Sequence, residues 1–219
     1  PPVRSPHQRG TGDATGHRRS LDAPQLRGSV EGAGQFHRQS ILVLMHPELT
    51  RAALESLARG HGFDAIGVSG VELPDDEAHL QDWLDRGYHG EMHYMQRHGT
   101  RRSEPATLKP GTLRVISVRM DYWPAQSRDA DEVLADPALG YVSRYALGRD
   151  YHRVMRPALA RLAADIAAQI APHDYRVFVD TGPVLEKALA RNAGLGWIGK
   201  HTNLIARDAG SMFFIGEIL

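Results

Sequence analysis

Residues 176–201, Arg-Val-Phe-Val-Asp-Thr-Gly-Pro-Val-Leu-Glu-Lys-Ala-Leu-Ala-Arg-Asn-Ala-Gly-Leu-Gly-Trp-Ile-Gly-Lys-His, join a strand, a helix and a glycine-rich turn. The apolar run that ends at Asp180 predicts a short strand, and the Ala/Leu pattern from Val184 to Asn192 predicts a helix. Helices and strands alternate on both sides of this stretch. The alternation favours an α/β fold in which a mixed sheet is flanked by helices.

Apolar spacing predicts the elements outside this stretch. The predicted helices begin at Pro47, at Asp75 and at Tyr151, and the last of them ends near Ala171. A short helical piece is expected over 91–97. The predicted strands cover Phe63–Gly70, Arg114–Tyr122, Asn203–Ala206 and Ser211–Leu219.

Residues 1–46 differ in composition from the rest of the chain. Arg, Gly, Pro, Ser and His dominate the first 40 residues without an apolar period, so we expect a disordered extension. It is either an RNA-binding arm or, because Met45 offers an internal start, a non-native addition. Residues 47–219 form the predicted domain, and the apolar run that reaches Leu219 leads us to expect truncation.

Composition excludes several classes of chemistry. Lys plus Arg and Asp plus Glu each total 26, so no global basic field draws the chain to nucleic acid. The absence of cysteine excludes disulfides, thiolate nucleophiles and Cys-ligated metal clusters in this chain. No apolar run approaches the roughly 20 residues of a membrane-spanning helix. We expect a soluble, monomeric protein in the cytoplasm.

The run Gly194-Leu-Gly-Trp-Ile-Gly-Lys-His201 is close to a P-loop, but His201 stands where a hydroxyl is needed and the run follows a helix instead of a strand. A phosphate-binding module is therefore disfavoured. Either the glycines let the backbone approach a large flat ligand, with Lys200 and His201 at its edge, or they form a plain tight turn.

His89, His93 and His98 lack the spacing of a zinc site, so we predict no metal site and expect solvated histidines. Asp180 follows a predicted strand, where open α/β sheets place ligand-contacting side chains, although its position alone favours an ordinary helix-capping role. Residues 141–152 combine tyrosines and arginines, which suits stacking and phosphate contact as well as an amphipathic junction.

Taken together, these segments resemble the epoxyqueuosine reductase family, and specifically its amino-terminal cobalamin-binding domain. The resemblance runs from about Pro47 to Leu219. It is carried by Gly-Tyr-His-Gly-Glu-Met-His-Tyr-Met around Tyr88, Leu-Lys-Pro-Gly-Thr-Leu-Arg-Val from Leu108, Tyr-Val-Ser-Arg-Tyr-Ala-Leu-Gly-Arg-Asp-Tyr-His from Tyr141, Val-Asp-Thr-Gly-Pro-Val-Leu-Glu-Lys from Val179 and the glycine-rich run.

The resemblance implies an oxidoreductase that reduces epoxyqueuosine to queuosine in tRNA, with cobalamin held without its base on the cobalt. Asp180 matches the family's proton donor, and burial beneath the corrin is expected to favour its protonated form. The positions that match cobalamin-contacting residues are Arg102, Ser143, Asp180, His201, Leu204 and Ile215.

The resemblance also implies [4Fe-4S] clusters, for which this chain has no ligands, and helical repeats that contact tRNA, which it lacks. We therefore expect a cobalamin-binding half that is inactive alone and depends on an external electron donor. A non-catalytic corrinoid-binding module is the alternative.

Overall fold

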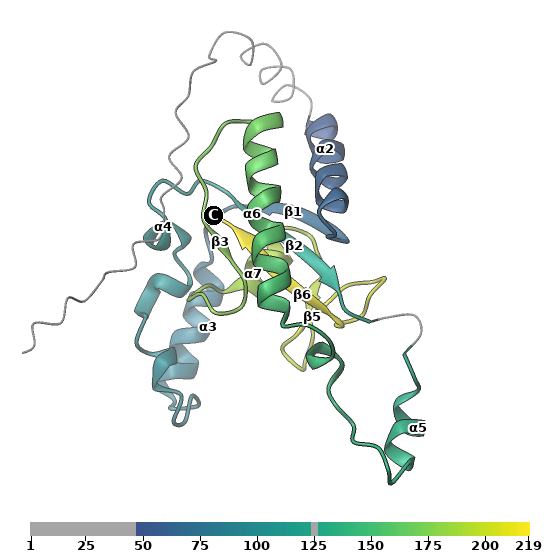
Figure 1. Cartoon of the computed structure of the whole chain (residues 1–219). Coiled ribbons are helices and arrows are strands. Elements are labelled where there is room, and N and C mark those ends of the chain that lie inside the picture. The colour runs from purple at the N-terminus through teal and green to yellow at the C-terminus, as the bar shows by residue number, and fades with distance from the viewer. Residues whose placement is uncertain (1–46, 124–126) are drawn as a thin grey trace, which may run out of the picture.

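A computed structural model describes residues 47–123 and 127–219 (Figure 1). The prediction of a disordered or non-native extension over residues 1–46 lies outside the described residues. Within them, no helix is long and apolar enough to cross a membrane.

A four-stranded sheet forms the centre of the domain, in the order β1-β2-β6-β3. Its strands are β1 (Ala65–Ser69), β2 (Val115–Asp121), β3 (Val177–Phe178) and β6 (Phe213–Ile218). The predicted α/β class is confirmed. The sheet is more uniform than a mixed sheet, because β1 with β2, β2 with β6 and β3 with β6 all pair antiparallel.

Two helices cover one face of the sheet, α2 (Pro47–Gly60) and α6 (Tyr151–Gln169) (Figure 1). Asp150 caps α6 by accepting a hydrogen bond from the His152 backbone N–H at 3.0 Å. Met155, Leu159, Leu162 and Ile166 of α6 are buried, at a spacing that places them on one side of the helix. Burial of each such side chain stabilises the fold by roughly 1.5–3 kcal/mol.

Helix α7 (Glu186–Asn192) packs on the other face, against β1, β2 and β6. After it the chain forms a two-stranded hairpin of β4 (Trp197–Ile198) and β5 (Leu204–Ile205). Leu204 and Phe213 share a hydrophobic cluster with Ala190 of α7, so the hairpin is fixed beside the sheet.

The remaining helices lie in the connections. The first connection carries α3 (Pro74–Asp85), η1 (His93–Met95), η2 (Gly99–Arg102) and α4 (Pro105–Leu108). The connection from β2 to α6 carries α5 (Ala130–Ala135) and η3 (Arg144–Ala146), and its α5 part projects away from the sheet (Figure 1). This connection leads directly into the first residues of α6, where the candidate site lies.

Candidate active site

Asp180 occupies a sharp turn immediately after β3. Its φ of +55° is unusual for a residue with a side chain. The Thr181 backbone N–H donates to the Val179 carbonyl at 2.6 Å, which closes a three-residue turn around Asp180. Because the sheet is antiparallel, the argument from the carboxyl ends of parallel strands does not explain this position. The tight turn itself places the Asp180 carboxylate at the pocket beside it.

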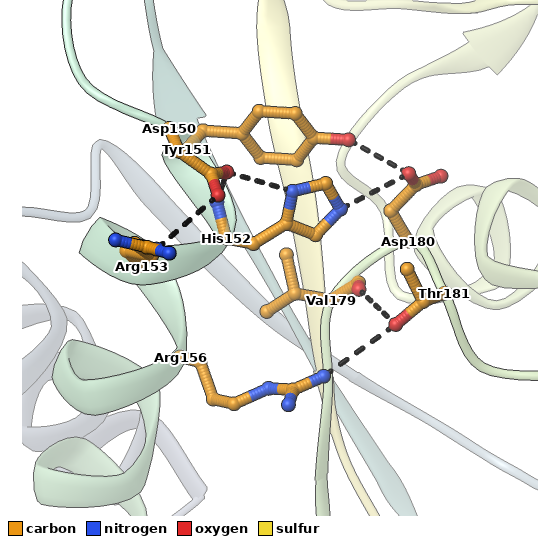
Figure 2. Close-up of polar contacts among 8 residues, drawn as sticks. All are labelled: Asp150, Tyr151, His152, Arg153, Arg156, Val179, Asp180 and Thr181. Atoms are coloured by element: carbon orange, nitrogen blue, oxygen red, sulfur yellow. Dashed lines mark hydrogen bonds and ion pairs between the residues drawn. The ribbon is translucent and has the colours of Figure 1, made fainter.

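The first turn of α6 provides two partners for the Asp180 carboxylate (Figure 2). The Tyr151 hydroxyl donates to Asp180 Oδ2 at 2.7 Å, and His152 Nε2 lies 3.3 Å from the same oxygen. Tyr151 is held between two rings, with Phe214 stacked at 4.1 Å and His152 at 4.0 Å. Burial raises the pKa of the Tyr151 phenol and its hydrogen bond to Asp180 raises it further, so the phenol stays protonated and donates.

A pocket of about 150 Å³ opens beside Asp180. The Asp180 side chain is 55% exposed, so solvent reaches it from this open side. Residues from α6, the Asp180 turn, α7, the β5 region and β6 line the pocket, namely Tyr151, Asp180, Glu186, Lys187, Asn203, Leu204, Ser211, Phe213, Phe214 and Ile215. Asp180 thus lies at the edge of a small cleft whose mixed polar and apolar walls include a second acid, Glu186.

Two further acids near the Asp180 turn are Glu186, which lines the pocket, and Glu217 on β6. Burial raises the pKa of Glu186 to about 7, and the charge of Asp180 adds to this rise, whereas Lys187 and a hydrogen bond from the Asp180 backbone act in the opposite direction. Glu217 on β6 is 1% exposed. Its Oε2 accepts a hydrogen bond from the Ser117 hydroxyl at 2.7 Å, and its Oε1 has no partner among the described residues.

We expect Glu217→Gln to remove a pH-dependent loss of stability. Burial raises the pKa of Glu217 well above its usual value, and the charge of Glu186 adds to this, against the Ser117 hydrogen bond. The folded state therefore retains a proton that the unfolded chain releases, so the free energy of unfolding falls as pH rises above the usual glutamate pKa of about 4.3. Each unit of pKa difference corresponds to about 1.4 kcal/mol.

Urea unfolding at about pH 5 and about pH 8 measures this effect, in the range where linkage predicts the loss. Wild type should lose more stability between the two pH values than Glu217→Gln. Glu72→Gln, at an exposed position, is the control and should behave like wild type. Equal losses in wild type and Glu217→Gln would show that Glu217 is ionised in the folded protein.

The structure brings several of the predicted site residues together. Asp180, Leu204 and Ile215 line the same pocket, although Leu204 is only 2% exposed. His201 lies at its rim, because His201 Nε2 is 3.5 Å from the hydroxyl of Ser211, which also lines the pocket. Whether these side chains contact a cofactor stays a prediction.

Arg102 and Ser143 lie outside this pocket. Arg102 ends η2, its carbonyl accepts a hydrogen bond from the Leu185 backbone N–H at 2.9 Å, and its Nε is buried without a partner. Leu185 is the N-cap of α7, so Arg102 is connected to the helix that carries Glu186. Ser143 precedes η3 in the exposed connection, and its side chain makes no capping hydrogen bond.

The glycine-rich run forms a hairpin strand and its turn. A Cβ on Gly196 would lie 2.2 Å from the Ile205 carbonyl oxygen, and one on Gly199 would lie 2.6 Å from His201 Nδ1. The Gly196 contact is with the backbone, so this glycine is required within the hairpin, whereas the Gly199 contact is with a side chain. The contacts within the hairpin favour the tight-turn alternative. The run contains β4 and is followed by β5 and not by a helix, so it lacks the strand–loop–helix arrangement of a P-loop.

The expectation of solvated histidines is wrong for His89. Its side chain is 7% exposed, because it packs against Trp83 with ring centroids 6.0 Å apart. His93 is exposed and its ring lies 6.2 Å from that of His89. Among the described residues, no group of three or more His, Cys, Asp or Glu side chains is arranged to hold a metal ion.

The sequence placed Tyr151 and His152 in a segment suited to stacking and phosphate contact but did not connect them with Asp180, and it gave Glu186 no site role. The first two precede Asp180 by 29 and 28 residues, so only the fold brings them to its carboxylate. One signal was present, since Asp150-Tyr-His152 stands at the start of a predicted helix. Glu186 lies six residues after Asp180, and its closeness depends on the turn that the chain makes at Asp180.

The fold and the pocket define an α/β domain that presents one carboxylic acid at an open face, with hydrogen-bond donors and apolar side chains around it. The family model described as epoxyqueuosine reductase QueG, DUF1730, matches residues 102–181. The chain is 57% identical over 178 residues to the epoxyqueuosine reductase of Xanthomonas campestris, covering 80% of this chain and 50% of that protein. The chain belongs to the epoxyqueuosine reductase family.

Other relatives agree with this assignment. The epoxyqueuosine reductase of Pseudomonas aeruginosa is 56% identical over 177 residues, covering 80% of this chain and 49% of the relative. A crystal structure of an epoxyqueuosine reductase with a tRNA-Tyr epoxyqueuosine-modified tRNA stem loop has the same fold, with a TM-score of 0.63 at 23% identity over 79% of this chain and 45% of that one. The chain spans about half the length of the curated relatives it matches.

Proposed function

We propose that this chain is the cobalamin-binding half of an epoxyqueuosine reductase, in which Asp180 protonates the oxygen that leaves the epoxide. One observation carries this proposal. Asp180 is held in a positive-φ turn at the mouth of a pocket, with its Oδ2 fixed by Tyr151. The contacts with Tyr151 and His152 both involve Oδ2, so Oδ1 can serve the substrate.

The residues around this pocket suit a corrin. His201 at the rim of the pocket supplies a donor for propionamide or phosphate groups. Arg102 and Ser143, which lie outside the pocket, would supply donors to the parts of a larger ligand that extend beyond it. Leu204 and Ile215 give the pocket apolar walls. Exposed apolar side chains stand in the segments that flank the site, namely Tyr141, Val142, Tyr145, Leu147, Trp197 and Ile198. Bound cobalamin supplies the electrons that cleave the carbon–oxygen bond.

The residues of this chain handle the proton. An alkoxide is a poor leaving group unless an acid protonates it, and a positioned acid contributes roughly 10²–10⁴-fold to the rate. A ligand that covers the open side of Asp180 would remove water from the carboxyl group and favour its protonated form. Tyr151 donates to Oδ2 and so limits the orientations available to the carboxyl group.

The remaining functions of the enzyme depend on other components. The solved relative with a modified tRNA stem loop supports tRNA carrying epoxyqueuosine as the substrate. The chain has no cysteine that could ligate [4Fe-4S] clusters, so the cluster ligands of the proposed enzyme belong to residues outside this half. We place the contact with the electron donor there as well. We place the protein with its tRNA substrate in the cytoplasm, as a monomer.

An optical titration of the chain with hydroxocobalamin tests this proposal. We expect a saturable spectral change, and about a tenfold loss of affinity in His201→Ala, which corresponds to one lost hydrogen bond of about 1.4 kcal/mol. His173→Ala is the matched control, because His173 is exposed, lies outside the lining of the pocket and contacts the carbonyl of Ala171 and the ring of Tyr175. No spectral change in a folded sample would contradict the proposal.

A further inference from the structure

His152 lies between two carboxylates (Figure 2). Its Nδ1 is 2.9 Å from Asp150 Oδ1, and its Nε2 is 3.3 Å from Asp180 Oδ2. The hydrogen bond from His152 lowers the pKa of Asp150, and the nearby Arg153 contributes in the same direction. Asp150 Oδ2 lies 3.7 Å from Arg153 Nε, which keeps this carboxylate ionised.

The ionised Asp150 determines which nitrogen of a neutral His152 carries the hydrogen. A carboxylate can only accept a hydrogen bond, so Nδ1 must donate to Asp150 and Nε2 is left as an acceptor. An accepting Nε2 can bond Asp180 Oδ2 only if that oxygen carries a proton. The alternative is a doubly protonated His152 that donates to an ionised Asp180, so in either state the His152–Asp180 pair shares one proton.

We infer that His152, oriented by Asp150, is a positioning residue that delivers this shared proton to Asp180, which then serves as the acid. This inference rests on the proposed function, since it says how the acid of that reaction is supplied. A ligand that covers Asp180 would remove water from the His152–Asp180 pair. Without water, a neutral His152 beside a neutral Asp180 carboxyl group has a lower free energy than a protonated His152 beside an ionised Asp180.

The proton transfers balance. First, the N–H bond at His152 Nε2 breaks as an O–H bond forms at Asp180, so that both groups become neutral. The O–H bond at Asp180 then breaks as its hydrogen moves to the leaving oxygen, which leaves Asp180 ionised. His152 stays neutral, with its remaining hydrogen on Nδ1 facing Asp150. The His152 side chain is 31% exposed and the Asp180 side chain is 55% exposed, so solvent can return the proton to Nε2 from the side of Asp180 once the covering ligand has left.

The tautomer of His152 tests this inference in the chain without any cofactor. Nitrogen NMR of histidine-labelled protein at about pH 8, where an ordinary histidine is neutral, distinguishes hydrogen on Nδ1 from hydrogen on Nε2. His152→Gln identifies the signal by its loss. We expect hydrogen on Nδ1 in wild type and a loss of this preference in Asp150→Ala, whose side chain has no acceptor for Nδ1. Hydrogen on Nε2 in wild type, or an unchanged tautomer in a folded Asp150→Ala variant, would overturn the inference.

A second measurement separates a proton-transfer role from a structural one. In a hybrid in which this chain is followed by the second half of the Xanthomonas campestris enzyme, His152→Gln should lower turnover at least about tenfold and leave hydroxocobalamin affinity unchanged, because glutamine can donate to Asp180 but cannot release a proton. Wild-type turnover in His152→Gln would also overturn the inference. Failure of the proposed function is recognised separately, as absent cobalamin binding in the wild-type chain.

Discussion

Asp180→Asn is expected to lower epoxyqueuosine reduction by about 10²–10⁴-fold, the contribution of a positioned general acid. The substitution is well suited to the site, because asparagine is among the residues that tolerate positive φ, and the turn at Asp180 has a φ of +55°. The Asn side chain can still accept the hydrogen bond from Tyr151. The fold, the turn and the pocket should therefore be retained while the transferable proton is lost.

Turnover is measured in the hybrid with the second half of the Xanthomonas campestris enzyme, with epoxyqueuosine-containing tRNA as substrate. Asp85→Asn provides the matched control, since Asp85 is exposed at the end of α3 and accepts a hydrogen bond from Gln81 at 2.7 Å. It should react at the wild-type rate. A wild-type rate in Asp180→Asn would show that another group donates the proton.

Gly67→Ala is expected to destabilise the chain by about 3 kcal/mol, at the upper end of the usual cost of overpacking. Gly67 lies in the centre of β1, and a Cβ there would stand 2.1 Å from the Ala193 carbonyl oxygen at the end of α7. The backbone at both positions is held by hydrogen bonds, because β1 pairs with β2 at Gly67 and the Ala193 backbone N–H donates to the Leu189 carbonyl. The helix would have to move away from the sheet, and Glu186 at its start would move with it.

Thermal unfolding measures this change. A loss of about 3 kcal/mol lowers Tm by roughly 6–12 °C in a domain of this size. Gly70→Ala is the control in the segment that follows β1, because a Cβ at Gly70 meets no heavy atom within 4 Å. It should leave Tm nearly unchanged. An unchanged Tm in Gly67→Ala would mean that the end of α7 does not contact Gly67 of β1 closely in solution.

The sequence predicted the long elements of this fold better than the short ones. The helix predicted over Tyr151–Ala171 is observed as Tyr151–Gln169, because its apolar residues recur over five turns of one face. The strand predicted over Arg176–Asp180 has only the residues Val177–Phe178, because the turn at Asp180 ends its pairing with β6. Strand β4 was not predicted, because it has only two residues and they lie within a glycine-rich run that was interpreted as a turn.

The candidate site was predicted in part. Asp180, Leu204 and Ile215 were named from resemblance and line one pocket, with His201 at its rim. The order of the strands could not be read from the chain, because antiparallel pairing between β2 and β6 joins residues about 100 positions apart, such as Ser117 and Glu217. The buried Glu217 was overlooked for the same reason, since in sequence it is an ordinary acid in an apolar strand.

The most direct test of the central claim is electron paramagnetic resonance of the purified chain mixed with cob(II)alamin. In free cob(II)alamin the nitrogen of the lower base splits the cobalt signal. The proposed site predicts that this splitting disappears when the wild-type chain binds cob(II)alamin. A signal that keeps the nitrogen splitting, in a sample shown to be folded by its thermal transition, would contradict the claim that this domain binds cobalamin without its base.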